Sequence, residues 1–205
     1  MTIRLHRGDL PDLSAYTGAV AIDTETMGLD PRRDRLCVVQ LSPGDGSADV
    51  VQIAAGQTRA PNIERLLADP DRLKLFHFGR FDIGVMANAF GVTAQPVYCT
   101  KIASRLARTY TDRHGLKDLA RELLGVDLSK QQQSSDWGAD SLSEAQVAYA
   151  ATDVLHLHAL KERLDAMLAR EGRAELAAAC FRFLPDRVRL DLAGWAEQDI
   201  FSHGV

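Results

Sequence analysis

The sequence lacks any apolar run approaching the ~20 residues that span a bilayer, and residues 1–6 form no hydrophobic signal segment. Its three cysteines, Cys37, Cys99 and Cys180, form no Cys-x-x-Cys pair, which disfavours structural zinc and predicts reduced thiols. There is no internal repeat and no low-complexity segment. We therefore expect a soluble cytoplasmic protein with no membrane partner.

An excess of positive charge is also absent, because 24 Lys and Arg stand against 28 Asp and Glu, for a formal net charge of -4. This argues against a basic surface that coats long nucleic acid, but it is compatible with a small, local phosphate site. The 205 residues, 46% hydrophobic and 25% charged, suffice for one well-buried core. We expect a single domain over 1–205, in which 182–205 is a C-terminal tail without clear periodicity.

Strand-like patterns dominate the first part of the chain and helical patterns the second. Strands are predicted at 2–6, 19–25, 36–41, 49–53, 73–78 and 97–99, and helices at 61–68, 82–91, 101–109, 115–124, 143–170 and 172–182. The turn sequence at 43–46 predicts that two of these strands form an antiparallel hairpin. The order of elements favours an α/β domain, or an α+β one, with a central mixed β-sheet flanked by helices.

The helix predicted from 143 has the best-defined start. Ser143 and Gln146 form a capping-box pattern, and Leu142 and Val147 occupy the positions of a hydrophobic staple. An apolar stripe continues along this helix and predicts that it packs on a core; the stripe comprises Ala150, Val154, Leu157, Leu164 and Leu168.

Four acids occur where such a sheet can gather them. Asp23 and Glu25 lie two apart in a strand and share a face, and Asp82 follows another strand. Tyr149 and Asp153 are four apart in a helix, so the phenol and the carboxylate project side by side. The alternatives are solvated acids at a strand end, a first-turn acid that compensates the helix dipole, and a tyrosine whose hydroxyl bonds within the core.

Converging carboxylates raise one another's pKa and cannot all ionise unaided. Two divalent cations resolve this conflict, and oxygen ligands select Mg²⁺ or Mn²⁺. A pair of such ions serves in-line attack on phosphates: one generates and positions a hydroxide, and the other stabilises the leaving 3′ oxygen. Tyr149 could then orient the attacking water.

Three segments carry a resemblance to a known family. Asp23-Thr-Glu25, His77-Phe-Gly-Arg-Phe-Asp82 and Tyr149-Ala-Ala-Thr-Asp153 look like the three motifs of DEDD 3′→5′ exonucleases, in the tyrosine branch that includes ribonuclease D. Residues 114–117, 130–137 and 142–146 also resemble ribonuclease D. The resemblance implies a ribonuclease H-like exonuclease fold with two bound cations. It implies metal ligation by Asp23, Glu25, Asp82 and Asp153, and catalysis by these acids with Tyr149.

The segment 28–35 is similar to one in oligoribonucleases, where a leucine, here Leu29, separates the two bases of a very short substrate. Together with the small size and the Phe201-Ser-His ending, it closely resembles the alphaproteobacterial nano-RNase C group. That resemblance implies a diribonuclease and a ring-shaped homo-octamer, without the C-terminal helical domains of ribonuclease D. Leu29 as a turn-packing residue is the alternative.

A protein of this charge with bound metal ions would be roughly neutral, so it has little excess positive charge with which to follow a long nucleic-acid backbone. A basic cluster could instead cap a 5′ phosphate, and a solvated helix face is the alternative for each member. Its candidates are Arg105, Arg108, Arg113, His114, Lys117, Lys130 and Gln133. His77 and the backbone of Thr24 complete the predicted substrate-binding set, Thr24 through the terminal 3′ hydroxyl.

The leading hypothesis is a metal-dependent 3′→5′ exoribonuclease that converts RNA dinucleotides to nucleoside 5′-monophosphates. One alternative is a broader exonuclease that trims longer RNA or DNA ends. A non-catalytic nucleic-acid-binding or scaffold domain is the other, and the presence of all four acids and the tyrosine disfavours it.

Overall fold

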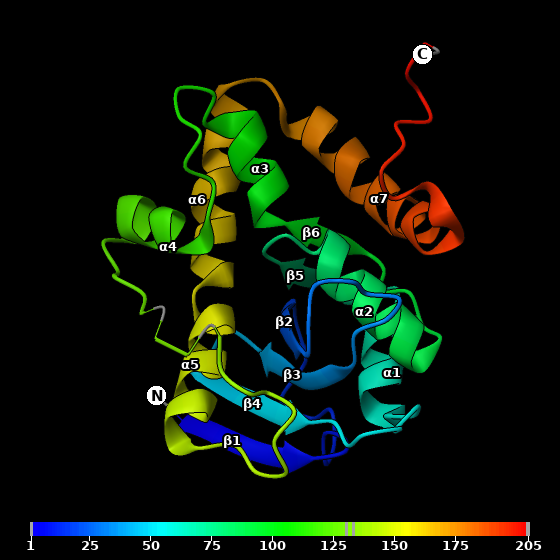
Figure 1. Ribbon diagram of the computed structural model, residues 1–205. Helices are drawn as coiled ribbons and strands as arrows, with labels where there is room; N and C mark the ends of the chain where they lie inside the picture. Colours follow the sequence, from blue (N-terminus) through cyan, green and yellow to red (C-terminus); the bar gives the residue numbers. More distant parts are fainter. Residues whose placement is uncertain (1, 130, 133, 204–205) are drawn as a thin grey trace.

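A six-stranded mixed sheet lies at the centre of the computed structural model, which describes residues 2–129, 131–132 and 134–203 (Figure 1). The strands are β1 (Thr2–Arg7), β2 (Val20–Thr26), β3 (Leu36–Ser42), β4 (Ser47–Gln52), β5 (Lys74–Phe76) and β6 (Val97–Cys99). They are ordered β1-β4-β3-β2-β5-β6. The inner strand β2 pairs antiparallel with β3 and parallel with β5, so the predicted mixed sheet is confirmed.

The predicted hairpin is also present, since β3 pairs antiparallel with β4. Strand β5 is shorter than the predicted 73–78 because the backbone turns at Phe78, which has a φ of 65°. The register of β2 against β3 shifts between Glu25 and Thr26. Such bulges bend a strand and re-aim its side chains, and this one lies beside a predicted site residue.

Helices cover both faces of the sheet (Figure 1). The elements are α1 (Pro61–Ala68), α2 (Arg80–Phe90), α3 (Thr100–Ala107), α4 (Leu116–Leu119), the π-helical turn η1 (Ala120–Leu124), α5 (Glu144–Leu155), α6 (Leu157–Arg170), α7 (Ala174–Leu190) and the π-helical turn η2 (Asp191–Trp195). Apolar residues of α1 and α2 pack in one core cluster, and those of α3, α5 and α6 in another. Helix α7 contributes Leu184 and Val188 to the first cluster and Ala177 to the second.

The start of α5 matches its prediction in detail. The Ser143 side chain accepts from the Gln146 backbone N–H, and the Gln146 side chain accepts from the Ser143 backbone N–H. The whole predicted apolar stripe is buried. The prediction of one continuous helix over 143–170 was wrong, because His156, with a φ of -105° and a ψ of -5°, separates α5 from α6.

The helix predicted over 172–182 extends further along the chain than its periodicity indicated. Helix α7 runs through Pro185 to Leu190, and η2 follows it. An internal proline normally disfavours a helix, but Leu184, Pro185 and Val188 are buried, and this tertiary packing outweighs the local penalty. Beyond the helix, Ile200 and Phe201 remain exposed.

Cys37, Cys99 and Cys180 are free thiols, as predicted. Within the described residues, none of the helices is both long enough and apolar enough to cross a membrane.

Candidate functional site: an acidic centre at strand β2

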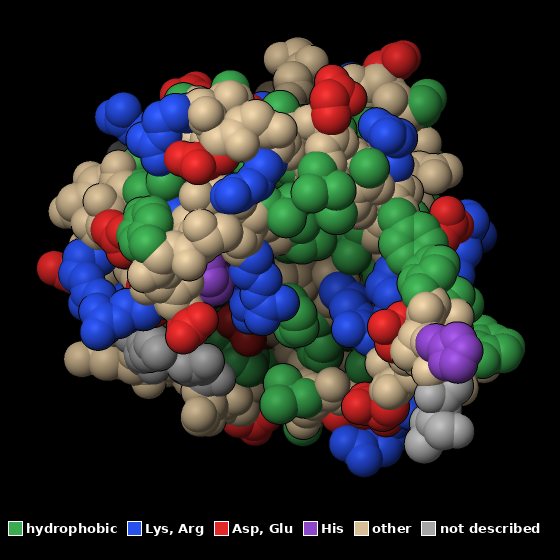
Figure 2. All heavy atoms as spheres, turned by 90° about the horizontal axis from the view of Figure 1, so that it is seen from above, with side chains coloured by type: hydrophobic (Ala, Val, Ile, Leu, Met, Phe, Trp, Pro, Cys, Tyr) green, Lys and Arg blue, Asp and Glu red, His purple; other side chains and the backbone are tan. Residues whose placement is uncertain are grey.

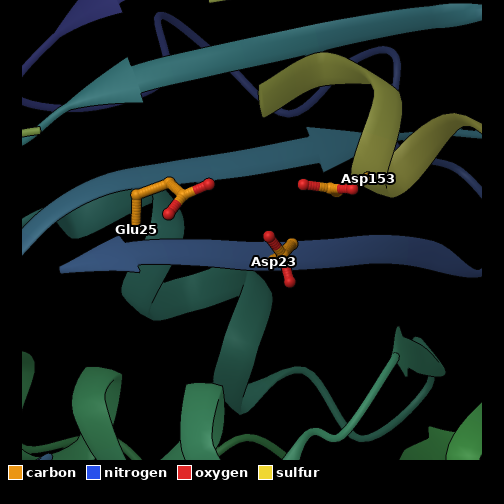
Figure 3. Close-up of side chains that lie close together, drawn as sticks. All are labelled: Asp23, Glu25 and Asp153. Atoms are coloured by element: carbon orange, nitrogen blue, oxygen red, sulfur yellow. The ribbon is translucent and has the colours of Figure 1, made fainter. Parts of the chain in front are cut away.

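Three predicted site acids converge at the middle of the sheet. Asp23 and Glu25 project from the same face of β2, and Asp153 approaches from α5 (Figure 3). One carboxylate oxygen from each residue lies within 4.8 Å of the other two. The period of a strand and the capped start of α5 together bring these oxygens into one small volume.

Asp82, the fourth predicted acid, lies beside this group in the first turn of α2. Only 4% of the residue is exposed, and its Oδ1 accepts a 2.6 Å hydrogen bond from the hydroxyl of Thr24 on β2. Thr24 therefore joins the strand that carries Asp23 and Glu25 to the helix that carries Asp82.

The electrostatics of the centre oppose ionisation. Burial, followed by the charges of Asp82, Asp153 and Glu25, holds the pKa of Asp23 well above its usual value. Burial together with Asp153 and Asp82 raises the pKa of Glu25 to about 8. Burial also raises the pKa of Asp82, against the opposing effect of the Thr24 hydrogen bond, and burial raises that of Asp153.

None of these four acids forms an ion pair within the part of the chain that the structure describes. Clustered carboxylates without basic partners are unfavourable in a low-dielectric setting unless cations offset their charge. An all-carboxylate donor set also suits hard cations such as Mg²⁺ and Mn²⁺. The residues present therefore fit a divalent cation site.

Tyr149 borders this centre from α5. Burial, then the charges of Asp153, Glu25 and Asp23, raises the pKa of its phenol, so the hydroxyl stays protonated and available as a donor. Its ring centroid lies 6.1 Å from that of Trp137, a residue 3% exposed, which limits the positions the phenol can take.

His77 is held neutral at the end of β5. Its Nδ1 lies 2.9 Å from the Thr100 hydroxyl, which donates to the carbonyl of Phe76. Because the Thr100 proton is used in that bond, we assign the proton between His77 and Thr100 to Nδ1, which leaves Nε2 as an acceptor. Burial, with the nearby charge of Lys101, lowers the pKa of His77 to about 3.

Leu29 projects from the loop after β2 and is 87% exposed. A side chain so exposed does not pack the turn, so the turn-packing alternative does not account for it. A Cβ at Gly28, the residue before it, would lie 2.2 Å from Oδ2 of Asp34, so a larger residue there would displace the Asp34 side chain.

The candidates for the predicted phosphate cap differ in exposure and in their partners. Arg108 is fully buried, where its guanidinium donates to the Arg113 carbonyl and pairs with Glu122, so it braces the chain and leaves the candidate cap. Arg105 and Arg113 are exposed, Lys117 is half-buried on α4, and His114 Nδ1 lies 2.8 Å from the Ser104 hydroxyl. Lys130 and Gln133 lie outside the described residues.

Two features near the centre were missed from the sequence. Phe78 is 46% exposed at positive φ, and the Nζ of Lys101 lies 4.2 Å from its ring centroid. Arg80 forms a two-bond ion pair with Asp191 of η2. The adjacent Gly79 gave the only local sign of an unusual backbone here, and no sequence pattern relates residues 111 apart.

Seen from above, the molecule has a central hollow with Lys and Arg side chains near its rim (Figure 2).

Residues 10–169 match a sequence family described as 3'-5' exonuclease. A ribonuclease D of Gluconacetobacter diazotrophicus is 37% identical over 167 residues, which are 82% of this chain and 42% of that protein. The chain therefore spans less than half the length of this curated relative.

Solved structures of similar length also match. The structure described as Brucella melitensis NrnC with bound Mg²⁺ is 63% identical, with a TM-score of 0.96 over 100% of both chains. Another, described as Brucella melitensis NrnC bound to pGG, is 64% identical, with a TM-score of 0.97 over 100% of both chains.

Proposed function

This chain belongs to the 3'-5' exonuclease family, and from that premise we propose that it hydrolyses very short RNA, especially dinucleotides, to nucleoside 5′-monophosphates. Leu29, four residues beyond Glu25 in sequence, carries the short-substrate proposal, because a side chain that is 87% exposed is free to separate two bases. The similarity to a nuclease described as bound to pGG supports the same substrate class.

Two divalent cations, Mg²⁺ or Mn²⁺, would be held by Asp23, Glu25, Asp82 and Asp153; when bound, they supply positive charge to the phosphate and lower the pKa of the attacking water. The clustered oxygens of three of these acids support this assignment. So does the similarity to a protein described with bound Mg²⁺.

The protein groups around the acids would position the substrate. The protonated hydroxyl of Tyr149 donates to the attacking water and orients it. The neutral Nε2 of His77 accepts from a sugar hydroxyl, and the Thr24 backbone contacts the terminal 3′ hydroxyl. The water attacks phosphorus, and the bond between phosphorus and the 3′ oxygen of the preceding nucleotide breaks. The 3′-terminal nucleoside therefore leaves with its 5′ phosphate.

The opposite end of the substrate would meet the phosphate cap. Its candidates are Arg113, His114 and Lys117, with Lys130 and Gln133, which lie outside the described residues. A cap that binds a 5′ phosphate directly penalises any longer chain, since an additional nucleotide would occupy the same volume. This limits turnover to short RNA.

We also propose that the chain works as a homo-oligomer, an octamer by its resemblance to the nano-RNase C group, and acts in the cytoplasm as one domain over 1–205. The exposed apolar side chains of Phe183, Trp195, Ile200 and Phe201 support a subunit contact at the C-terminal end. Light scattering would measure the subunit number, and a monomer at micromolar concentration would contradict the assembly.

The decisive experiment compares Mg²⁺-dependent turnover of a 5′-phosphorylated RNA dinucleotide with that of 5′-phosphorylated RNA of five to seven nucleotides. Fast loss of the dinucleotide with slow trimming of the longer RNA is expected. Equal or faster trimming of the longer RNA would favour the alternative, a general exonuclease acting on RNA or DNA ends.

A further inference from the structure

The strand beside β2 carries a buried amide that the rest of the fold does not use. Gln40 lies within β3 and is fully buried. Neither its amide oxygen nor its amide nitrogen has a hydrogen-bond partner among the described residues, and in that part of the chain it is the one residue with two such atoms. A buried amide without a partner costs free energy, so its presence at this position requires an explanation.

The register of the sheet places Gln40 next to a predicted metal ligand. Gln40 is the pairing partner of Asp23 in the antiparallel ladder between β2 and β3. Residues directly opposite each other in such a ladder share a face of the sheet, with their Cβ atoms about 4.5–5.5 Å apart. The Gln40 side chain therefore lies on the face that carries Asp23 and Glu25, and its amide is within reach of the Asp23 carboxylate.

The other neighbours of Gln40 on this face leave the amide without a partner. Val50, opposite it on β4, and Val38, two residues before it, are apolar. The hydroxyl of Ser42, two residues after it, is already bonded to backbone groups of the hairpin between β3 and β4. Helix α5 packs against β2, β3 and β4 and covers this face with apolar residues. Asp23 is therefore the polar neighbour on these strands with which the amide can pair.

A second glutamine on the same face shows what a structural amide does in this fold. Gln52 of β4 is the pairing partner of Val38, and its amide nitrogen donates a 2.8 Å hydrogen bond to the carbonyl of Ala139. That bond connects β4 to the segment before α5. Gln40 makes no bond of this kind within the described residues, so a structural link does not account for it.

The chemistry of the side chain suits a donor to a metal-binding carboxylate. A carboxylate at position 40 would add a further negative charge to the acidic centre, and a cationic side chain would compete with metal ions for the acids. A neutral amide avoids both effects. Thr24 already plays this part for Asp82, to which its hydroxyl donates. Hydrogen bonds from such neighbouring groups orient metal ligands and raise the affinity of the site.

We propose that Gln40 is a positioning residue for Asp23, whose carboxylate its amide nitrogen holds in the cation-binding orientation, directly or through one bridging water; this rests on the cation site of the proposed function. Gln40 then acts through Asp23 and touches neither the substrate nor the cation. The amide oxygen still lacks a protein partner, so the residue lowers the stability of the fold while it strengthens cation binding. These two effects have opposite signs and can be measured separately.

The test uses full-length Gln40→Met, which keeps the length of the side chain and removes the amide. We expect the dissociation constant for Mn²⁺, measured by isothermal titration without substrate, to rise about 10- to 100-fold, the effect of losing a group that orients a metal ligand. The chelator-treated variant should melt at or above the chelator-treated wild type, because a buried amide with an unpaired atom has been removed.

Gln52→Met is the matched control, since it makes the same substitution on the same face of the sheet. It removes the hydrogen bond to Ala139, so it should lower the melting temperature and leave the Mn²⁺ affinity unchanged. A loss of Mn²⁺ affinity equal to that of Gln40→Met would contradict a role specific to Gln40.

Combining Gln40→Met with Asp23→Asn separates an effect through Asp23 from a general disturbance of the site. In the Asp23→Asn background, the second substitution should cause no further loss of the remaining Mn²⁺ affinity. An unchanged Mn²⁺ affinity in Gln40→Met alone, or the same loss with and without the Asp23 carboxylate, would overturn the positioning role. A wild type that binds no Mn²⁺ would instead overturn the cation site on which the proposed function depends, so the two failures are distinguishable.

Discussion

The hydroxyl of Thr24 donates a 2.6 Å hydrogen bond to Oδ1 of Asp82, across 58 positions of sequence. This bond favours the ionised form of a carboxylate whose burial otherwise raises its pKa. It also fixes the orientation of the only predicted metal ligand on α2.

Thr24→Val should therefore weaken cation binding by leaving Asp82 with a higher pKa and a freer rotamer. We expect the Mg²⁺ concentration for half-maximal dinucleotide hydrolysis to rise about 10- to 100-fold, the effect of losing a partner that orients a metal ligand. Thr24→Ser retains the hydroxyl and should remain near the wild type. An unchanged Mg²⁺ dependence in Thr24→Val would show that Asp82 needs no support from β2.

Asp153→Asn should have opposite effects on activity and on stability. Without cations, Asp153 is a buried carboxylate beside Asp23 and Glu25, so neutralising it relieves repulsion and burial cost. We expect the chelator-treated variant to melt about 2–4 °C above the chelator-treated wild type. A gain of roughly 1 kcal/mol in the free energy of unfolding produces a shift of this size in a chain of this length. Hydrolysis should fall at least about a hundredfold, a typical loss when one preorganised electrostatic group is removed.

Thermal melting with and without Mg²⁺ checks the same assignment. The wild type should gain more stability from Mg²⁺ than Asp153→Asn does, because a ligand that binds the folded state more tightly stabilises it more. Equal gains in the two proteins would contradict metal ligation by Asp153.

Tyr149→Phe should slow the chemical step more than substrate binding. The phenol remains protonated beside three acids, so its loss removes a donor to the attacking water while the ring still packs near Trp137. We expect kcat to fall by about a hundredfold, with KM changed little. This is the lower end of the rate contribution typical of a positioned acid–base group. Single-turnover rates separate the two effects, and an unchanged kcat would reduce Tyr149 to a packing role.

A second buried acid, Asp49 on β4, predicts a stability effect away from the site. Burial opposes its ionisation, but hydrogen bonds from Arg4 at 2.7 Å, Tyr16 at 2.6 Å and His6 at 2.7 Å outweigh burial and lower its pKa to about 2. The unfolded chain, with a pKa of about 3.9, then binds more protons than the folded chain between these values. Stability from Asp49 is complete above the unfolded pKa and is lost as pH falls toward 2.

Asparagine in Asp49→Asn resembles the protonated aspartic acid. The difference in the free energy of unfolding between the wild type and this variant therefore isolates the contribution of the ionised Asp49 carboxylate. At neutral pH the variant should be less stable by roughly 2 kcal/mol, and the difference should shrink between about pH 4 and pH 2. Urea unfolding at several pH values measures it. A difference that is constant over this range would mean that the hydrogen bonds do not depend on the charge of Asp49.

Elements whose signals are local could be predicted from the sequence. The capping box of Ser143 and Gln146 set the start of α5, and the periods of strand and helix set which faces Asp23, Glu25 and Asp153 occupy. Periodicity and helix-capping signals are encoded within a few residues, so they can be recognised without knowledge of the fold. The mixed sheet and the convergence of these three acids followed from them.

Features that depend on partners elsewhere in the sequence could not be predicted before the fold was known. Burial of Leu184 and Val188 extends α7 past Pro185 and so beyond the helix predicted over 172–182. The ion pair of Arg108 with Glu122 removes that arginine from the candidates for the predicted phosphate cap, although Arg105 and Arg113 lie near it in sequence. Contacts with residues elsewhere in the sequence fix both, and a local pattern carries no information about them.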